Sequence, residues 1–132
     1  MAKILVDADA LIALAKTDDD NHPKALKTGR LYRDNEICLT PYTLPEVVTV
    51  LSHKVSQSAA RKYLLESESR NWQILETTPE IISRTNHFFI AQSKKGTSWV
   101  DCLNCIMVKH YHLNGIFSFD KFYSRQKIKM IK

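Results

Sequence analysis

Short apolar runs alternate with amphipathic stretches from one end of the chain to the other. The apolar runs predict buried strands at residues 3–7, 36–40, 72–75 and 116–119, with a short last strand at 128–131. The stretches between them have the composition and spacing of helices, at residues 8–16, 22–32, 43–51, 58–68, 79–93 and 98–111. This alternation predicts an α/β fold with three layers, in which a mostly parallel central sheet of four or five strands carries helices on both faces.

Two of the helix starts carry the sequence pattern of a capping box. Thr43 stands as a candidate N-cap with Pro45 in the first turn and Glu46 three residues later, and Ser98 stands three residues before Asp101. In such a box the hydroxyl of the first residue accepts a hydrogen bond from the backbone N–H of the acid. The pattern therefore predicts that both helices begin at these residues.

The size of the chain indicates one domain, and its charge indicates an acidic partner. With 132 residues and 44% hydrophobic content, residues 1–132 are expected to form a single domain around one core. The net charge of +5 and the pI near 9.2 favour an acidic partner. Nucleic acid is the commonest such partner, but an acidic protein fits equally well.

Cysteine usage and hydropathy indicate a reducing, aqueous compartment. The three cysteines Cys38, Cys102 and Cys105 make an odd count at apolar positions, so a disulfide framework is not expected. The apolar run at residues 4–6 is too short for the core of a signal peptide, and no stretch is long enough to cross a membrane. We therefore expect a cytoplasmic protein that does not associate with membranes.

Four acidic residues stand where an apolar run gives way to a turn or to the start of a helix. They are Asp7, Glu46, Asp101 and Asp120. In an open α/β sheet the carboxyl ends of the strands meet along one crevice, so side chains distant in sequence can converge there. Two carboxylates about 4 Å apart repel by roughly 4 kcal/mol at an effective dielectric constant near 20. A hard divalent cation with oxygen ligands is the natural counter-charge, so the pattern predicts one shared metal site.

Each acid also has a purely structural interpretation. Asp9 can cap the first helix, with Asp7 as a turn residue, which would contribute about 1 kcal/mol of stability. Glu46 and Asp101 can serve as capping residues, and Asp120 can cap the turn at residues 122–123. Taken singly, each acid is explained by these local roles. Their conjunction at four element junctions is what favours a metal site, with Asp9 and Ser98 as accessory residues.

At these residues the chain resembles the PIN-domain nucleases, and most closely the VapC-type toxins of toxin–antitoxin pairs. The matching segments are residues 4–14, 43–47, 98–103 and 117–122, in the family's order and over essentially the whole chain. The resemblance implies a PIN-like fold in which the four acids bind Mg²⁺ or Mn²⁺ and direct water onto an RNA phosphodiester. It also implies a cognate antitoxin protein and a homodimer.

The resemblance suggests a role for each acid and shows two departures from the family pattern. Asp7 and Asp101 would be the principal metal ligands, Asp120 would complete the site directly or through water, and Glu46 would be a ligand or a water-orienting base. The position of Asp9 is more often Asn, Ser or Thr in the family, and the position of Cys102 is usually Ala. Neither departure removes an acid.

Basic residues near the acids are candidates for contact with RNA. Lys94 and Lys95 precede the helix that carries Asp101, and the C-terminal segment contains Lys121, Arg125, Lys127, Lys129 and Lys132. Contacts of these residues with phosphates would make binding strongly salt-dependent. A solvated surface, or a patch for an acidic protein, explains them equally well. Trp99 can stack on a base, although packing is the simpler role for it.

Three other functions compete with a nuclease. The first is a structural zinc site at Cys102 and Cys105, but this pair lies within a predicted helix and lacks the second ligand pair of a zinc finger. The five histidines form no motif. A haloacid-dehalogenase-like phosphatase would use Asp7 as nucleophile and Asp9 as acid or base, but it needs paired acids near the C-terminus. A PIN-like module that binds RNA or protein without cleavage is the non-enzyme alternative.

Overall fold

A four-stranded, wholly parallel sheet forms the centre of the computed structural model, which describes residues 2–131. Its strands are β1 (Lys3–Val6), β2 (Glu36–Leu39), β3 (Gln73–Ile74) and β4 (Gly115–Phe117), in the order β3-β2-β1-β4. The α/β class and the parallel sheet predicted from the alternating pattern are therefore confirmed. Lys132, one of the predicted basic residues, lies outside the described residues.

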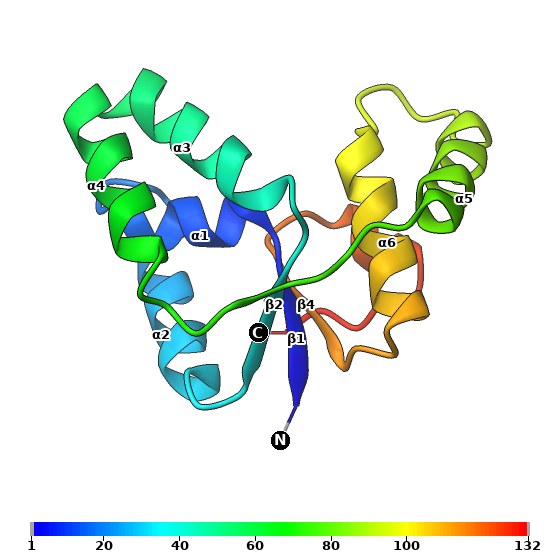
Figure 1. Cartoon of the computed structure of the whole chain (residues 1–132), viewed down its shortest axis with the longest axis horizontal. Coiled ribbons are helices and arrows are strands. Elements are labelled where there is room, and N and C mark those ends of the chain that lie inside the picture. The colour runs from blue at the N-terminus through cyan, green and yellow to red at the C-terminus, as the bar shows by residue number, and fades with distance from the viewer. Residues whose placement is uncertain (1, 132) are drawn as a thin grey trace.

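Within residues 2–131, seven helices cover the two faces of this sheet (Figure 1). The helices α1 (Ala8–Ala15), α2 (His22–Tyr32), α3 (Thr43–Lys54) and α4 (Gln57–Ser67) lie on one face. The helices α5 (Pro79–Ile90), α6 (Trp99–His110) and the short α7 (Phe122–Arg125) lie on the other. No helix within residues 2–131 combines the length and apolar character needed to cross a membrane.

The central strand β1 shows why the sequence folds into three layers. Successive side chains of a strand point to opposite faces of the sheet. Ile4 and Val6 belong to the hydrophobic cluster beneath α1–α4, whereas Leu5 belongs to the cluster beneath α5–α7. Both faces are covered, so all three side chains must be apolar, as the uninterrupted run predicts.

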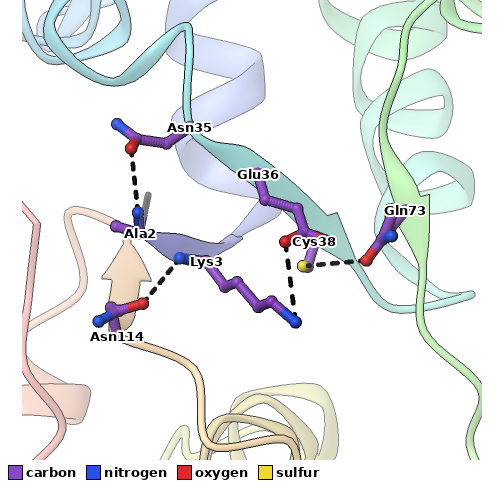
Figure 2. Close-up of polar contacts among 7 residues, drawn as sticks. All are labelled: Ala2, Lys3, Asn35, Glu36, Cys38, Gln73 and Asn114. Atoms are coloured by element: carbon purple, nitrogen blue, oxygen red, sulfur yellow. Dashed lines mark hydrogen bonds and ion pairs between the residues drawn. The ribbon is translucent and has the colours of Figure 1, made fainter.

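The edge of the sheet where β1 and β2 begin, which we call the amino edge, is closed by local polar contacts (Figure 2). The Asn35 side chain accepts a hydrogen bond from the backbone N–H of Ala2 at 3.1 Å, and that of Asn114 accepts from Lys3 at 2.7 Å. The Lys3 ammonium lies 3.8 Å from the Glu36 carboxylate. Charge at this edge is thus compensated by a neighbouring strand.

The predicted last strand at residues 128–131 is wrong as a strand. The segment forms only an isolated parallel bridge between Ile116 and Met130. The Ile116 N–H donates to the Lys129 carbonyl at 2.9 Å, and the Ile131 N–H donates to the Ile116 carbonyl at 2.8 Å. A Cβ on Gly115 would lie 2.6 Å from the Lys129 carbonyl oxygen, so glycine is required for this close approach.

The predicted capping box at the start of α3 is also wrong. Tyr42 occupies the N-cap position without a side-chain hydrogen bond, and Thr43 is the first helical residue. The buried Thr43 hydroxyl instead accepts from the backbone N–H of Thr40 at 3.3 Å and lies 3.2 Å from the Thr40 hydroxyl. A side chain used to close the preceding turn cannot also cap the helix.

Candidate acidic site

Asp7 anchors the site at the carboxyl end of β1. It is the N-cap of α1, and its Oδ1 accepts a hydrogen bond from the Ala8 backbone N–H at 2.8 Å. Oδ1 also accepts from the Asn104 amide at 3.3 Å, and Oδ2 accepts from the hydroxyls of Ser118 and Tyr123, both at 2.9 Å. These four contacts match the acceptor capacity of a carboxylate, so Asp7 is held in one orientation.

Asp9 ties α1 to the segment that follows β4. It lies in the first turn of α1 and is not the cap, because Asp7 has the extended backbone of the N-cap position. Its Oδ2 accepts from the Phe119 backbone N–H at 3.0 Å, and both of its oxygens lie 3.2 Å from the Ser118 hydroxyl. The single Ser118 proton is therefore shared between two acids, Asp7 and Asp9.

Asp101 enters the site from the first turn of α6. The Ser98 hydroxyl accepts from the Asp101 backbone N–H at 3.0 Å, which confirms the predicted cap and gives Ser98 a structural role. The Asp101 side chain accepts from the Tyr123 hydroxyl at 3.1 Å. Asp101 and Asp7 thus contact the same phenol.

Glu46 and Asp120 complete the set of acids. Glu46 lies in the first turn of α3 and is largely exposed. Asp120 is half-buried; its backbone N–H donates to the Ser118 hydroxyl at 3.1 Å, and its Oδ1 accepts from the Phe122 N–H at 2.9 Å. The latter contact is the turn cap that the structural interpretation of Asp120 predicts, so this acid has a local role as well.

The four carboxylates lie close enough for their charges to act on one another's surroundings. Burial raises the pKa of Asp7, and the charge of Asp101 raises it further, against the hydrogen bonds of Ser118 and Tyr123. Burial and the charge of Asp120 likewise raise the pKa of Asp101. The pKa of Glu46 is raised by partial desolvation and then by the charges of Asp7 and Asp101. Acids from four separate elements therefore repel one another at one edge of the sheet.

Asp9 adds a fifth charge to this edge. Burial, followed by the charge of Asp7, raises the pKa of Asp9 to about 7, although the Phe119 N–H and the Ser118 hydroxyl oppose the shift. The charge of Asp120 contributes in the same direction as that of Asp7. Asp9 is therefore electrostatically part of the site, although its hydrogen bonds serve to fasten α1 to the end of β4.

The chemistry of the donor set fits a hard divalent cation. All five acids offer only oxygen, the preferred ligand of Mg²⁺ and Mn²⁺. Within residues 2–131 none of these five carboxylates forms an ion pair with a basic side chain. Over the same residues, no three acidic, histidine or cysteine side chains are arranged to hold an ion. The site therefore has the charge and the oxygen donors for a hard cation.

Three buried polar residues of the site were missed by sequence reasoning. They are Asn104, Ser118 and Tyr123, exposed by 2%, 3% and 0%. A signal existed for Asn104, since it is a lone amide within the apolar run of residues 102–108, and for Ser118, which interrupts an aromatic run. Tyr123 carried no signal, because a tyrosine in a short turn gives no indication of where its hydroxyl points.

The predicted RNA-contacting residues lie on the surface. Lys94 and Lys95 are exposed in the loop before α6. Lys121, directly after Asp120, is exposed at the start of α7, and Arg125 is exposed at its end. Trp99 packs edge-to-face on Tyr42, with ring centroids 5.6 Å apart, and its indole N–H donates to Asn86 at 2.8 Å. These contacts favour the packing role for Trp99.

The geometry disfavours two of the competing functions. A phosphatase of this kind would use Asp9 as acid or base, yet both Asp9 oxygens lie 3.2 Å from the Ser118 hydroxyl and one accepts from the Phe119 N–H, so this carboxylate fastens α1 to the segment after β4. The three cysteines are free and buried, and burial raises the pKa of each thiol, most for Cys105, to about 12. All three side chains belong to the hydrophobic cluster beneath α5–α7, which is a packing role.

Comparison with known proteins identifies relatives of this fold. The PIN-domain family model matches residues 4–129. Among solved structures, Mycobacterium tuberculosis VapC20, a toxin that cleaves the sarcin–ricin loop, superposes with a TM-score of 0.84 at 17% identity, over 96% of each chain. A search of curated proteins found no match.

Proposed function

This chain belongs to the PIN-domain family, and from that premise we propose that it is a divalent-metal-dependent endoribonuclease, the toxin of a toxin–antitoxin pair. The observation that carries the proposal is the gathering of four acids, Asp7, Glu46, Asp101 and Asp120, at one edge of the sheet. Burial and the charges of neighbouring acids in this set raise the pKa values of Asp7, Glu46 and Asp101, and no basic side chain among residues 2–131 pairs with them. Repulsion between these carboxylates is destabilising unless an ion is bound. A group of acids that repel one another in this way therefore supports a functional site.

The residues of the chain divide the work by their burial. The buried Asp7 and the half-buried Asp101 would hold the cation, with Asp120 completing the site directly or through water. Bound there, Mg²⁺ or Mn²⁺ supplies positive charge for the phosphate and acidifies water. Glu46 is exposed and its pKa is raised, so it is suited to orient or deprotonate a water molecule.

For the RNA backbone we propose the exposed Lys94, Lys95, Lys121 and Arg125. Replacing Lys94 and Lys95 together by Ala should weaken RNA binding about equally for all sequences and lower the salt dependence of affinity by about 2 in its log–log slope. Filter binding in EDTA at several salt concentrations measures this. An unchanged slope would assign the two lysines to solvent or to a protein partner.

For the protein partners we propose an acidic antitoxin and a second copy of this chain. The basis is the fold shared with VapC20, a toxin, together with the net charge of +5. Co-expression with the product of the adjacent upstream gene tests the first partner, and light scattering of the purified protein tests the second. A chain that stays monomeric and binds no neighbouring gene product would act alone.

The nuclease proposal is tested by RNA cleavage with added Mn²⁺ or Mg²⁺. We expect products that vanish with EDTA and that are absent with Asp7→Ala or Asp101→Ala, whose folding is checked by circular dichroism. Sequencing of RNA ends after controlled expression, with Asp7→Ala as control, then identifies the cut. RNA binding without metal-dependent products would instead support a non-catalytic RNA-binding module, and full activity in either variant would defeat the assignment of the site.

A further inference from the structure

A buried chain of hydrogen bonds joins α6 and α7 to the two central acids. The Asn104 amide donates to the Tyr123 hydroxyl oxygen at 2.9 Å and to Asp7 at 3.3 Å. The Tyr123 hydroxyl lies 2.9 Å from Asp7 and 3.1 Å from Asp101. Solvent is almost excluded from these hydrogen bonds, since Tyr123 is 0% exposed and Asn104 is 2% exposed.

The available protons fix the direction of these hydrogen bonds. A phenol has one proton and an asparagine amide is a fixed donor. Because Asn104 already donates to the Tyr123 oxygen, the phenol proton is directed to the acids, and it can serve only one of them well at a time. The other carboxylate then faces a phenol oxygen at about 3 Å without a shared proton, a contact that nearby positive charge would relieve.

The phenol also sets the spacing of the two acids. The acceptor oxygens of Asp7 and Asp101 lie 2.9 Å and 3.1 Å from one hydroxyl oxygen, and are therefore within about 6 Å of each other. Two oxygens that share one Mg²⁺ at about 2.1 Å are separated by about 3–4 Å. The hydroxyl thus keeps the two oxygens together, within a limit that includes the spacing an ion requires.

From these contacts we infer that Tyr123, oriented by Asn104, is a positioning residue that holds Asp7 and Asp101 ready for a divalent cation. Carboxylates that bind metal are commonly fixed by such outer hydrogen bonds, whose loss typically lowers metal affinity 10–100-fold. The inference rests on the proposed metal site but not on RNA cleavage, since it concerns the affinity of the protein for the ion.

The decisive variant is Tyr123→Phe, which removes one oxygen and keeps the ring in the core. Mn²⁺ affinity, measured by calorimetry on the full chain, should fall about 10–100-fold. Activity should be lost at low Mn²⁺ and largely recovered at saturating Mn²⁺. Tyr111→Phe is the matched control, because it removes a tyrosine hydrogen bond of 2.6 Å to the Glu76 carbonyl away from the acids. Its Mn²⁺ affinity should be unchanged.

A purely structural tyrosine would give a different result. Tyr123→Phe would then lower the unfolding temperature in EDTA while Mn²⁺ affinity stayed at the wild-type value, and that outcome overturns the inference. Asn104→Leu, which keeps the phenol but frees its orientation, should weaken Mn²⁺ binding less than Tyr123→Phe does, and it serves as the test if Tyr123→Phe does not fold.

The same measurements separate this inference from the proposed function. Wild-type protein that binds Mn²⁺ but cleaves no RNA would contradict the nuclease. The positioning role would stand if Tyr123→Phe still weakens Mn²⁺ binding. Cleavage by wild-type protein with equal Mn²⁺ affinity in Tyr123→Phe would contradict the positioning role alone. Wild-type protein that binds no Mn²⁺ would overturn both.

Discussion

The two edges of the same sheet treat charge in opposite ways. At the amino edge the Glu36 carboxylate has Lys3 at 3.8 Å, and side-chain amides cap the free backbone groups (Figure 2). At the opposite edge, where β1 ends and which we call the carboxyl edge, burial and the charge of Asp101 raise the pKa of Asp7, and burial and the charge of Asp120 raise the pKa of Asp101. No basic side chain among residues 2–131 pairs with these acids. Structure alone requires only the first arrangement. The second arrangement lowers stability, which is what we expect where a group of residues serves a function.

The largest expected difference between the edges is in activity. Asp101→Asn should lower RNA cleavage at saturating Mn²⁺ by about 10²–10³-fold, because it removes a charge that acts on the reacting centre. Glu36→Gln removes a carboxylate from the amino edge and should leave the rate unchanged. Initial rates on a fluorescent RNA measure both. Equal losses in the two variants would show that the edges do not differ in function.

Bound cation should stabilise the folded protein through the carboxyl edge only. Mn²⁺ at about 100 times its dissociation constant should raise the free energy of unfolding by about 2.7 kcal/mol, because the ion binds the native state. Urea unfolding with and without Mn²⁺ measures the effect. Glu36→Gln should retain the full increase and Asp101→Asn should lose most of it. Stabilisation of Asp101→Asn to the wild-type level would place the ion elsewhere.

Ionisation of Asp9 should destabilise the metal-free protein. Its pKa rises from 3.8 to about 7 on folding, so between these values the native state binds more protons than the unfolded chain. The free energy of unfolding should therefore fall as pH rises through this window, with Asp9 contributing a slope of up to about 1.4 kcal/mol per pH unit. Above pH 7 the contribution levels off.

The variant Asp9→Asn isolates this effect. Urea unfolding in EDTA across the same pH window should show a shallower fall for Asp9→Asn than for the wild type, because the amide does not ionise. Identical slopes in the two proteins would mean that the charge of Asp9 is tolerated without penalty.

The smallest effect is expected at the amino edge. Lys3→Met breaks the ion pair with Glu36, in which both side chains are partly exposed, so the free energy of unfolding should change by less than about 1 kcal/mol. RNA cleavage should not change. Thermal unfolding and the rate assay measure the two properties, and a large loss of stability would mean that this pair matters more than its exposure indicates.

The fold was predictable because its determinants are local in sequence. The uninterrupted apolar run of β1 encodes a strand covered on both faces, and Asp7 follows it directly. The cap at Ser98 was likewise readable, since donor and acceptor lie three residues apart. Thr43 shows the limit of such patterns. Its hydroxyl contacts Thr40, three residues before it, and not Glu46, three residues after it.

The residues that orient the acids were not predictable because their partners are distant. Asn104 and Asp7 are 97 residues apart, and Tyr123 and Asp7 are 116 apart. Neither spacing corresponds to the period of a helix or a strand, so no local pattern encodes the contact. The positions of the acids could be inferred from where elements end, whereas their support depends on how α6 and α7 pack across the sheet.

The close approach of the C-terminal segment to Gly115 affects how the protein meets other copies of itself. An unpaired outer strand invites hydrogen bonding with a neighbouring molecule, which leads to aggregation. The backbone of Ile116 is occupied by Lys129 and Ile131, and on the opposite flank β3 spans only two residues. The edge strand β4 is thus covered by the C-terminal segment, and the other edge strand, β3, is too short to pair with a strand of another molecule. Little open backbone remains for intermolecular β-pairing.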